Sequence, residues 1–104
     1  MVSDYRCEFD AELWLSESSE GAGSYVSLPA DAADDISQIH AGRTGGFGSV
    51  RVEVTVGGST WRTSIFPDVK RRNFALPVKK AVRTAEGIDA GSTVHVVLRT
   101  LPAD

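Results

Sequence analysis

The side chains that could perform catalysis are few in this sequence, and their spacing does not form a catalytic set. The chain contains two histidines, His40 and His95, and one cysteine, Cys7. An acid-base enzyme requires a nucleophile and a base within hydrogen-bond reach, or paired carboxylates whose pKa values differ, and a zinc site requires a cluster of ligands. Neither histidine belongs to a His-x-x-x-His pair. The sequence therefore predicts neither a metal nor a cofactor and favours a protein that is not an enzyme, with an enzyme as the remaining alternative.

Three other features have simple structural explanations. Cys7 shares its strand face with apolar residues, so a buried small hydrophobe is expected rather than a reactive thiol. The glycine-rich run 42–48 lacks the Gly-Lys-Ser/Thr ending of a phosphate-binding loop and follows a helix instead of preceding one, so its glycines free the backbone between elements. Asp31, Asp34 and Asp35 lack calcium-loop spacing and suit the first turns of a helix.

A basic segment is the best candidate for a binding surface. Residues 69–85 contain six cationic side chains and no acid, which favours contact with an anion. Trp61, just before it, would add an aromatic platform, and the combination suits a flat anionic ligand, a carboxylate-bearing peptide or a phosphate backbone. Two simpler interpretations stay open, because the cations can form a solvated face and Trp61 can pack in the core. The candidate ligand-binding residues are Trp61, Arg62, Ser64, Lys70, Arg71, Arg72, Lys79 and Arg83.

The charges are unevenly distributed along the chain. Residues 1–42 carry nine acids against Arg6 alone, whereas residues 43–104 carry ten bases and five acids. Affinity for nucleic acid comes largely from neutralising phosphates, so the acidic half would repel a duplex unless the fold segregates it. The sequence thus favours a domain that binds a small anionic ligand or an acidic protein segment through a basic face centred on Lys79 and Arg83. A nucleic-acid-binding regulator is the alternative.

Hydrophobic patterns predict a mostly β chain with two short helices. Residues 5–15 alternate between apolar and charged side chains, as in a half-buried strand with Leu15 on the buried face. Gly57-Gly58 predicts a tight hairpin, and Pro77 suits the start of a helix. The expected strands are 5–15, 24–28, 50–56, 59–66, 74–76 and 93–101, and the expected helices run from residue 30 to Gly42 and over residues 78–85.

Two stretches of the chain follow one plan. YVSLP (25–29), a helix and GSVRV (48–52) correspond to FALP (74–77), a helix and GSTVHV (91–96). Each unit alone would expose an apolar sheet face, and packing the two about a pseudo-two-fold axis would bury both faces. Leu-Pro before a helix and Gly-Ser before a strand are also common at the boundaries of such elements, so chance similarity is the alternative. Duplication predicts a double-split β-barrel with an internal pseudo-two-fold repeat.

Several segments resemble known families. ALPVKKAVR (75–83) and GIDAGSTV (87–94) resemble the half-barrel of AbrB-like transcription factors and antitoxins, which dimerise to complete their barrel. The runs FGSVRV (47–52), GSTWRTSIFP (58–67) and LPVKKAVR (76–83) together resemble domain-of-unknown-function family nineteen-oh-five over residues 5–101. That resemblance implies a double-split β-barrel and no established activity. Lys70-Arg71-Arg72-Asn73 departs from it, because relatives tend to have a glycine-containing turn there.

Length and composition limit the architecture. With 104 residues and 41% hydrophobic content, the chain is expected to form one domain, residues 1–104, with a single core and a ligand site that is a surface groove. The first ten residues lack the apolar core of a signal peptide, and no window approaches the roughly 18 apolar residues of a membrane span. A cytoplasmic protein without a membrane partner is expected. Because both barrel halves lie in one chain, it should be a monomer or a weak homodimer.

Overall fold

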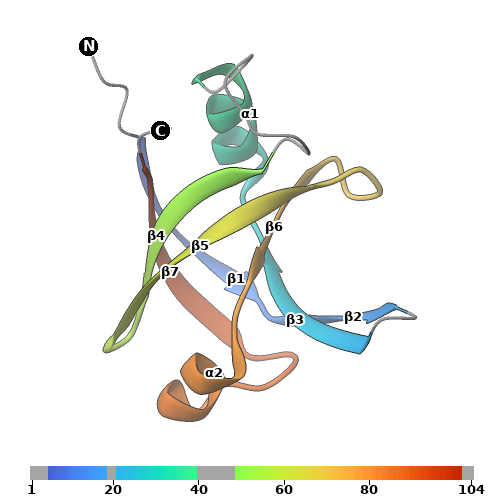
Figure 1. Ribbon diagram of the computed structural model, residues 1–104, viewed down its shortest axis with the longest axis vertical. Coiled ribbons are helices and arrows are strands. Elements are labelled where there is room, and N and C mark those ends of the chain that lie inside the picture. Colours follow the sequence, from blue (N-terminus) through green and yellow to red (C-terminus); the bar gives the residue numbers. More distant parts are fainter. Residues whose placement is uncertain (1–4, 19–20, 40–48, 102–104) are drawn as a thin grey trace.

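A curled antiparallel sheet of seven strands with two helices makes up the fold (Figure 1). The computed structural model describes residues 5–18, 21–39 and 49–101. Figure 1 shows the two helices at opposite ends of the half-barrel that the sheet forms. The predicted mostly β fold is confirmed. The strands are β1 (Arg6–Glu12), β2 (Trp14–Ser18), β3 (Gly21–Ser27), β4 (Val50–Val56), β5 (Ser59–Asp68), β6 (Asn73–Pro77) and β7 (Thr93–Thr100), and the helices are α1 (Ala30–Ile39) and α2 (Lys80–Glu86).

The two edge strands of the sheet are consecutive in the chain. The strand order is β1-β7-β4-β5-β6-β3-β2, and only Leu13 separates β1 from β2. Its amide donates to the Ser92 carbonyl and its carbonyl accepts from the Gly91 amide, both at 2.9 Å. We call residues 6–18 the bridging segment. Since it pairs with β7 through β1 and with β3 through β2, it joins one edge of the curled sheet to the other.

One apolar cluster fills the inside of the curl. Every second residue of β4 is a buried valine, from Val50 to Val56, and Val94, Val96 and Leu98 of β7 are buried in the same alternation. The alternation predicted for these two strands is confirmed. Both helices, the edge strand β1 and Leu13 of the bridging segment contribute to the same cluster. Its further members include Phe9, Leu13, Val26, Ile36, Ile65, Leu76 and Val82.

Several element boundaries differ from the sequence-based expectation. The strand expected over residues 5–15 divides at Leu13, and the prediction that Leu15 is buried is wrong, because its side chain is 53% exposed. After Leu13 the chain pairs only with β3. As the outer strand of the β2-β3 ribbon, β2 meets solvent on both faces. Strand β5 continues through Pro67 to Asp68 instead of stopping there. Helix α2 begins at Lys80 because Val78 is buried and its amide donates to the Ser24 carbonyl of β3. The predicted helix end at Gly42 lies outside the described residues.

The predicted two-residue hairpin joins β4 to β5, and α2 packs beside it. Gly57 has φ 58°, a left-handed conformation that glycine adopts without steric cost. Glu86, the last residue of α2, accepts from the Ser59 hydroxyl at 2.7 Å and from the Gly58 amide at 3.4 Å. A Cβ at Gly57 would meet the end of the flexible Glu86 side chain, so glycine is required here for its conformation, and the Glu86 carboxylate occupies the space beside it.

The element order is compatible with the predicted duplication. The units β3-α1-β4 and β6-α2-β7 have the same order, and their corresponding strands pair with each other, β3 with β6 and β4 with β7. The internal repeat itself stays a prediction. None of the helices in the described ranges is long and apolar enough to cross a bilayer.

Two neighbouring leucines test the role of the bridging segment. Leu13 is 1% exposed and Leu15 is 53% exposed. Leu13→Ala should lower the free energy of unfolding by about 2–5 kcal/mol, because it leaves a cavity in the core. Leu15→Ala, the matched control, should change it by less than about 1 kcal/mol. Urea denaturation measures both, and equal effects would contradict the inward position of Leu13.

Candidate functional site

The structure distributes the predicted ligand-binding residues over three places. Lys70, Arg71 and Arg72 lie in the turn between β5 and β6, near α1 in Figure 1. Lys79 and Arg83 belong to α2 and its N-terminus, at the opposite end of the molecule (Figure 1). Trp61, Arg62 and Ser64 lie between them on β5. The basic segment therefore does not form one continuous patch.

Because side chains alternate along a strand, Trp61 and Arg62 of β5 lie on opposite faces of the sheet. Trp61 lies across from Val54 and packs against the core cluster. Arg62 is on the outer face, where its Nε lies 3.5 Å from a Glu53 carboxylate oxygen. Arg99 donates to the other oxygen of Glu53 at 2.9 Å, and this hydrogen bond is the main reason why the pKa of Glu53 is lowered. Arg62 is thus part of a charge network on the sheet.

The α2 candidates have different surroundings. Arg83 is half-buried, and its Nε donates to the Val78 carbonyl at 3.2 Å. Its own carbonyl accepts from the amide of Gly87, which ends α2 in a left-handed conformation. Lys79 is exposed and in an extended conformation just before the helix. Arg83 therefore contributes to the local structure of α2, and Lys79 extends into solvent.

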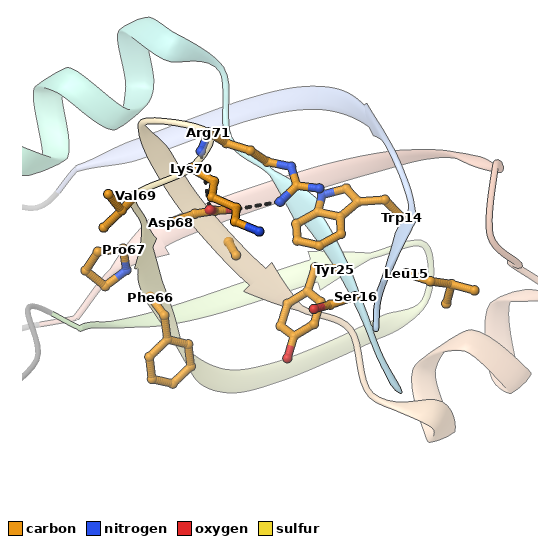
Figure 2. Close-up of a pocket in the computed structure, with 11 residues that line it drawn as sticks. Trp14, Leu15, Ser16, Tyr25, Phe66, Pro67, Asp68, Val69, Lys70 and Arg71 are labelled. Atoms are coloured by element: carbon orange, nitrogen blue, oxygen red, sulfur yellow. Dashed lines mark hydrogen bonds and ion pairs between the residues drawn. The ribbon is translucent and has the colours of Figure 1, made fainter. Parts of the chain in front are cut away.

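Lys70 and Arg71 lie at an open groove of about 550 Å³ on the outer face of the sheet. We call it the hairpin groove. Figure 2 shows Phe66 and Pro67 on one side of it and Trp14 and Tyr25 on the other, with the turn residues between them. The groove is lined by Trp14, Leu15, Ser16, Tyr25, Phe66, Pro67, Asp68, Val69, Lys70, Arg71 and Ala75.

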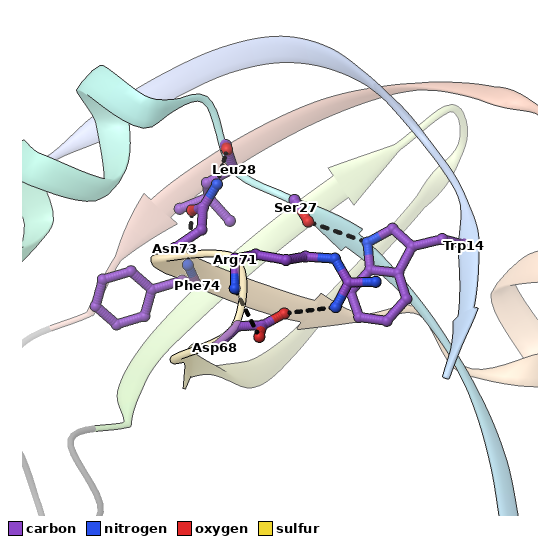
Figure 3. Close-up of polar contacts among 7 residues, drawn as sticks. All are labelled: Trp14, Ser27, Leu28, Asp68, Arg71, Asn73 and Phe74. Carbon is purple, nitrogen blue, oxygen red and sulfur yellow. Dashed lines mark hydrogen bonds and ion pairs between the residues drawn. The ribbon is translucent and has the colours of Figure 1, made fainter. Parts of the chain in front are cut away.

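A stack of aromatic and cationic groups fixes one wall of the hairpin groove (Figure 3). The Arg71 guanidinium carbon lies 3.8 Å from the centre of the Trp14 ring. Asp68 holds the same arginine twice, accepting from its Nη1 at 3.0 Å and from its backbone amide at 3.3 Å. The Trp14 indole N–H donates to the Ser27 hydroxyl at 3.0 Å. Arg71 therefore lies in a defined position over the ring.

Tyr25 continues the stack along β3. Its ring centroid lies 5.1 Å from that of Trp14, its partner across the strands, with 27° between the planes. Gly23, two residues earlier on the same face, lies under the tyrosine, since a Cβ there would be 2.7 Å from Cε1 of Tyr25. The glycine thus provides the space that this tyrosine orientation needs.

Sequence reasoning did not identify Trp14, Tyr25, Phe66 and Asp68 as site residues. In the alternating pattern, Trp14 occupies a position that faces away from the core. A tryptophan at an outward position was the one signal in the sequence that could have indicated a site. Its contact with Arg71 joins residues 57 positions apart (71 minus 14). Such a contact follows only from the pairing of β2, β3, β6 and β5 into one sheet.

A second, smaller groove lies on the α1 side of the same turn. It measures about 240 Å³ and is lined by residues of α1, including Asp34 and Ser37, and of the hairpin, including Arg72 and Asn73. Arg72 has φ 52°, which is uncommon for a residue other than glycine. The consecutive residues Arg71 and Arg72 therefore line two different grooves.

His95 and Cys7 lie away from both grooves. The two ring nitrogens of His95 each lie 2.6 Å from a carboxylate oxygen, one of Asp10 and one of Glu8. Hydrogen bonds to Asp10 and then Glu8 raise the pKa of His95. Cys7 is half-buried against the core, and burial raises the pKa of its thiol, so it lacks the depressed pKa of a reactive cysteine. His40 and the glycine-rich run 42–48 lie outside the described residues.

No metal site is evident among residues 5–18, 21–39 and 49–101, where no three His, Cys, Asp or Glu side chains are arranged to hold an ion. The carboxylates of Asp10 and Glu8 bind opposite nitrogens of one imidazole instead of converging on a common point. This arrangement suits an ion pair between strands β1 and β7.

Comparison with known proteins identifies a family for this chain. Residues 9–98 match the model of a family described as Domain of unknown function (DUF1905), in agreement with the resemblance found in the sequence. No curated protein matches the chain.

The His95 ion pairs predict a pH-dependent contribution to stability. Because the folded-state pKa is raised above 6.5, the contribution should be fully present below pH 6.5 and lost as the pH rises through the folded-state value. Urea denaturation of wild type and His95→Gln should show a larger difference at about pH 5.5 than at about pH 8.5. Asp10→Asn should reduce this pH dependence, and a difference that is constant with pH would refute it.

The backbone of Arg72 predicts a stabilising substitution. A left-handed conformation costs a residue with a Cβ about 1–2 kcal/mol, and glycine does not have this cost. Arg72→Gly should therefore leave the free energy of unfolding unchanged or raise it by up to about 1 kcal/mol, since glycine loses more entropy on folding. Arg72→Val, with a branched Cβ, should lower it. If Arg72→Gly is the more harmful change in thermal denaturation, side-chain contacts of Arg72 outweigh its backbone strain.

Proposed function

The chain belongs to the DUF1905 family, and we propose that it is a single non-enzymatic binding domain for a small anionic ligand or an acidic protein segment. The hairpin groove is its binding site. Of the eight candidates from the sequence, Lys70 and Arg71 line this groove. Of the other candidates, Arg72 lines the second groove, Trp61, Arg62 and Ser64 lie on β5, and Lys79 and Arg83 lie at α2.

The observation that carries the proposal is the position of the two cations in an aromatic groove. Lys70 and Arg71 border a concave surface that also includes Trp14, Tyr25 and Phe66. Its volume of about 550 Å³ is in the range of small-molecule sites, which combine apolar walls with a few placed polar groups. Arg71 can donate two parallel hydrogen bonds to a carboxylate or phosphate, and Lys70 adds a mobile ammonium group.

Nucleic-acid binding is the second candidate, and the outer face of the sheet supports it. Arg6 of β1 lies directly across from Arg99 of β7, which brings two cations together on this face, although Arg99 is already paired with Glu53. Arg51 and Arg62 are exposed on the next two strands. Three exposed acids of β1, Glu8, Asp10 and Glu12, lie on the same face and would repel phosphates. The hairpin groove is therefore the preferred site.

Two double substitutions with identical chemistry test the proposed site. Lys70→Gln/Arg71→Gln removes the cations of the groove, and Lys79→Gln/Arg83→Gln removes the same residue types from α2. Thermal unfolding is measured with small organic mono- and dianions and with a glutamate-rich peptide. An anion present at 100 times its Kd should stabilise wild type and the α2 variant by about 2.7 kcal/mol and leave the groove variant unshifted.

Two results would contradict this proposal. One is the absence of stabilisation by every anion, and the other is loss of the shift in the α2 variant alone, which would place the site on α2. A gel-shift titration of DNA and RNA duplexes at low salt tests the second candidate. Retardation that disappears in Arg6→Gln/Arg99→Gln would favour nucleic-acid binding through the outer face.

A further inference from the structure

The apolar surface of the hairpin groove indicates which anion it takes. Three large hydrophobic side chains are exposed in the described part of the chain: Leu15 (53%), Phe66 (45%) and Val69 (87%). All three line this groove. Single exposed hydrophobic residues are normal on a protein surface, but Phe66 and Val69 border one concavity together with two cations, which is typical of a ligand site, whereas the side chain of Leu15 points away from it (Figure 2). Burying Phe66 and Val69 provides binding energy that a purely ionic ligand cannot use.

Arg71 is arranged in advance to receive a carboxylate. Its side chain remains 47% exposed even though Asp68 binds Nη1 and the Trp14 ring covers one face of the guanidinium. In the described ranges, no acceptor contacts its Nε or Nη2, so one edge of the guanidinium is available for two parallel hydrogen bonds. A surface arginine normally loses rotamer freedom on binding, and here much of that entropy is already lost on folding.

The charge of the groove favours a single negative charge on the ligand. Lys70 and Arg71 contribute two positive charges, and Asp68 contributes one negative charge. The sum is one positive charge beside a fixed carboxylate, which penalises a second negative charge on the ligand.

We propose that the hairpin groove binds a small carboxylic acid with one negative charge and a flat apolar body. The carboxylate contacts the open edge of Arg71 and the ammonium of Lys70, and the apolar body lies against Phe66 and Val69 (Figure 2). The volume of the groove matches a small molecule, and a carboxylate is complementary to its net charge. This inference rests on the proposed function and specifies its ligand.

Matched probes separate the parts of this proposal. Isothermal titration calorimetry and amide-resonance titration are performed with 2-naphthoate, its neutral amide 2-naphthamide, the dianion 2-naphthyl phosphate, and acetate. Naphthoate should bind at least about tenfold more tightly than naphthamide, because a charge-assisted pair is lost with the amide. Naphthyl phosphate should bind no more tightly than naphthoate, and acetate should show no measurable binding.

Variants then assign the contacts. Lys70→Gln and Phe66→Ser should each weaken naphthoate binding several-fold, and Arg71→Lys should weaken it about tenfold, because lysine keeps the charge but lacks the planar fork. Lys79→Gln, an exposed lysine at α2, is the control and should bind as wild type. Thermal unfolding confirms that each variant is folded, and Lys70→Gln remains decisive if Arg71→Lys loosens the turn.

The outcomes distinguish this inference from the proposed function. Equal binding of naphthoate and naphthamide, or tighter binding of naphthyl phosphate, would overturn the inference; if a dianion or the acidic peptide still depends on Lys70 and Arg71, the proposed function stands. A free-acid tripeptide ending in Phe that binds at least tenfold more tightly than naphthoate would replace the small acid with a peptide terminus and overturn the inference. Absence of binding by every anion would remove both.

Discussion

The bridging segment constrains everything else in this fold. Its first half pairs with β7 and its second half with β3, at the two edges of the sheet. Between the halves, the backbone of Leu13 makes two hydrogen bonds to the turn before β7, and its side chain is in the core. Because side chains alternate along a strand, a shift of one residue would expose Leu13 and bury Trp14. The buried leucine therefore determines that the neighbouring tryptophan faces outward.

The hairpin groove follows from that outward tryptophan. Strand β5 continues through Pro67 to Asp68, so the β5-β6 turn reaches β2 and Arg71, held by Asp68, lies over the Trp14 ring. The Arg71–Trp14 stack joins the turn to the β2-β3 ribbon, and between described residues no ion pair connects these two parts. The same contacts that stabilise this corner also position the guanidinium edge for a ligand. The structure of this corner and the proposed binding thus depend on the same arginine.

Local sequence patterns predicted the strands and helices, whereas long-range strand pairing determines which residues lie together at the hairpin groove. The valines of β4 and the alternation of β7 were identified from the sequence because strand periodicity depends only on neighbours. Leu15 was misplaced because the same alternation continues where the partner strand changes from β7 to β3, and a sequence does not reveal that change. Lys70 and Arg71 were identified by charge, but their separation from Lys79 and Arg83 is a consequence of the length and direction of β6. Trp14 and Tyr25 were not identified, since the partners that define them lie far away in sequence.

Native-state hydrogen exchange of the Leu13 and Gly91 amides tests the bridging role of residues 6–18 most directly. Both amides take part in the hydrogen bonds at the junction of β1 and β2. If this junction closes the curled sheet, both amides should exchange only through global unfolding, with an opening free energy equal to that measured by denaturation. Exchange at the rate of an exposed loop, while the β4 and β7 amides stay protected, would contradict the account.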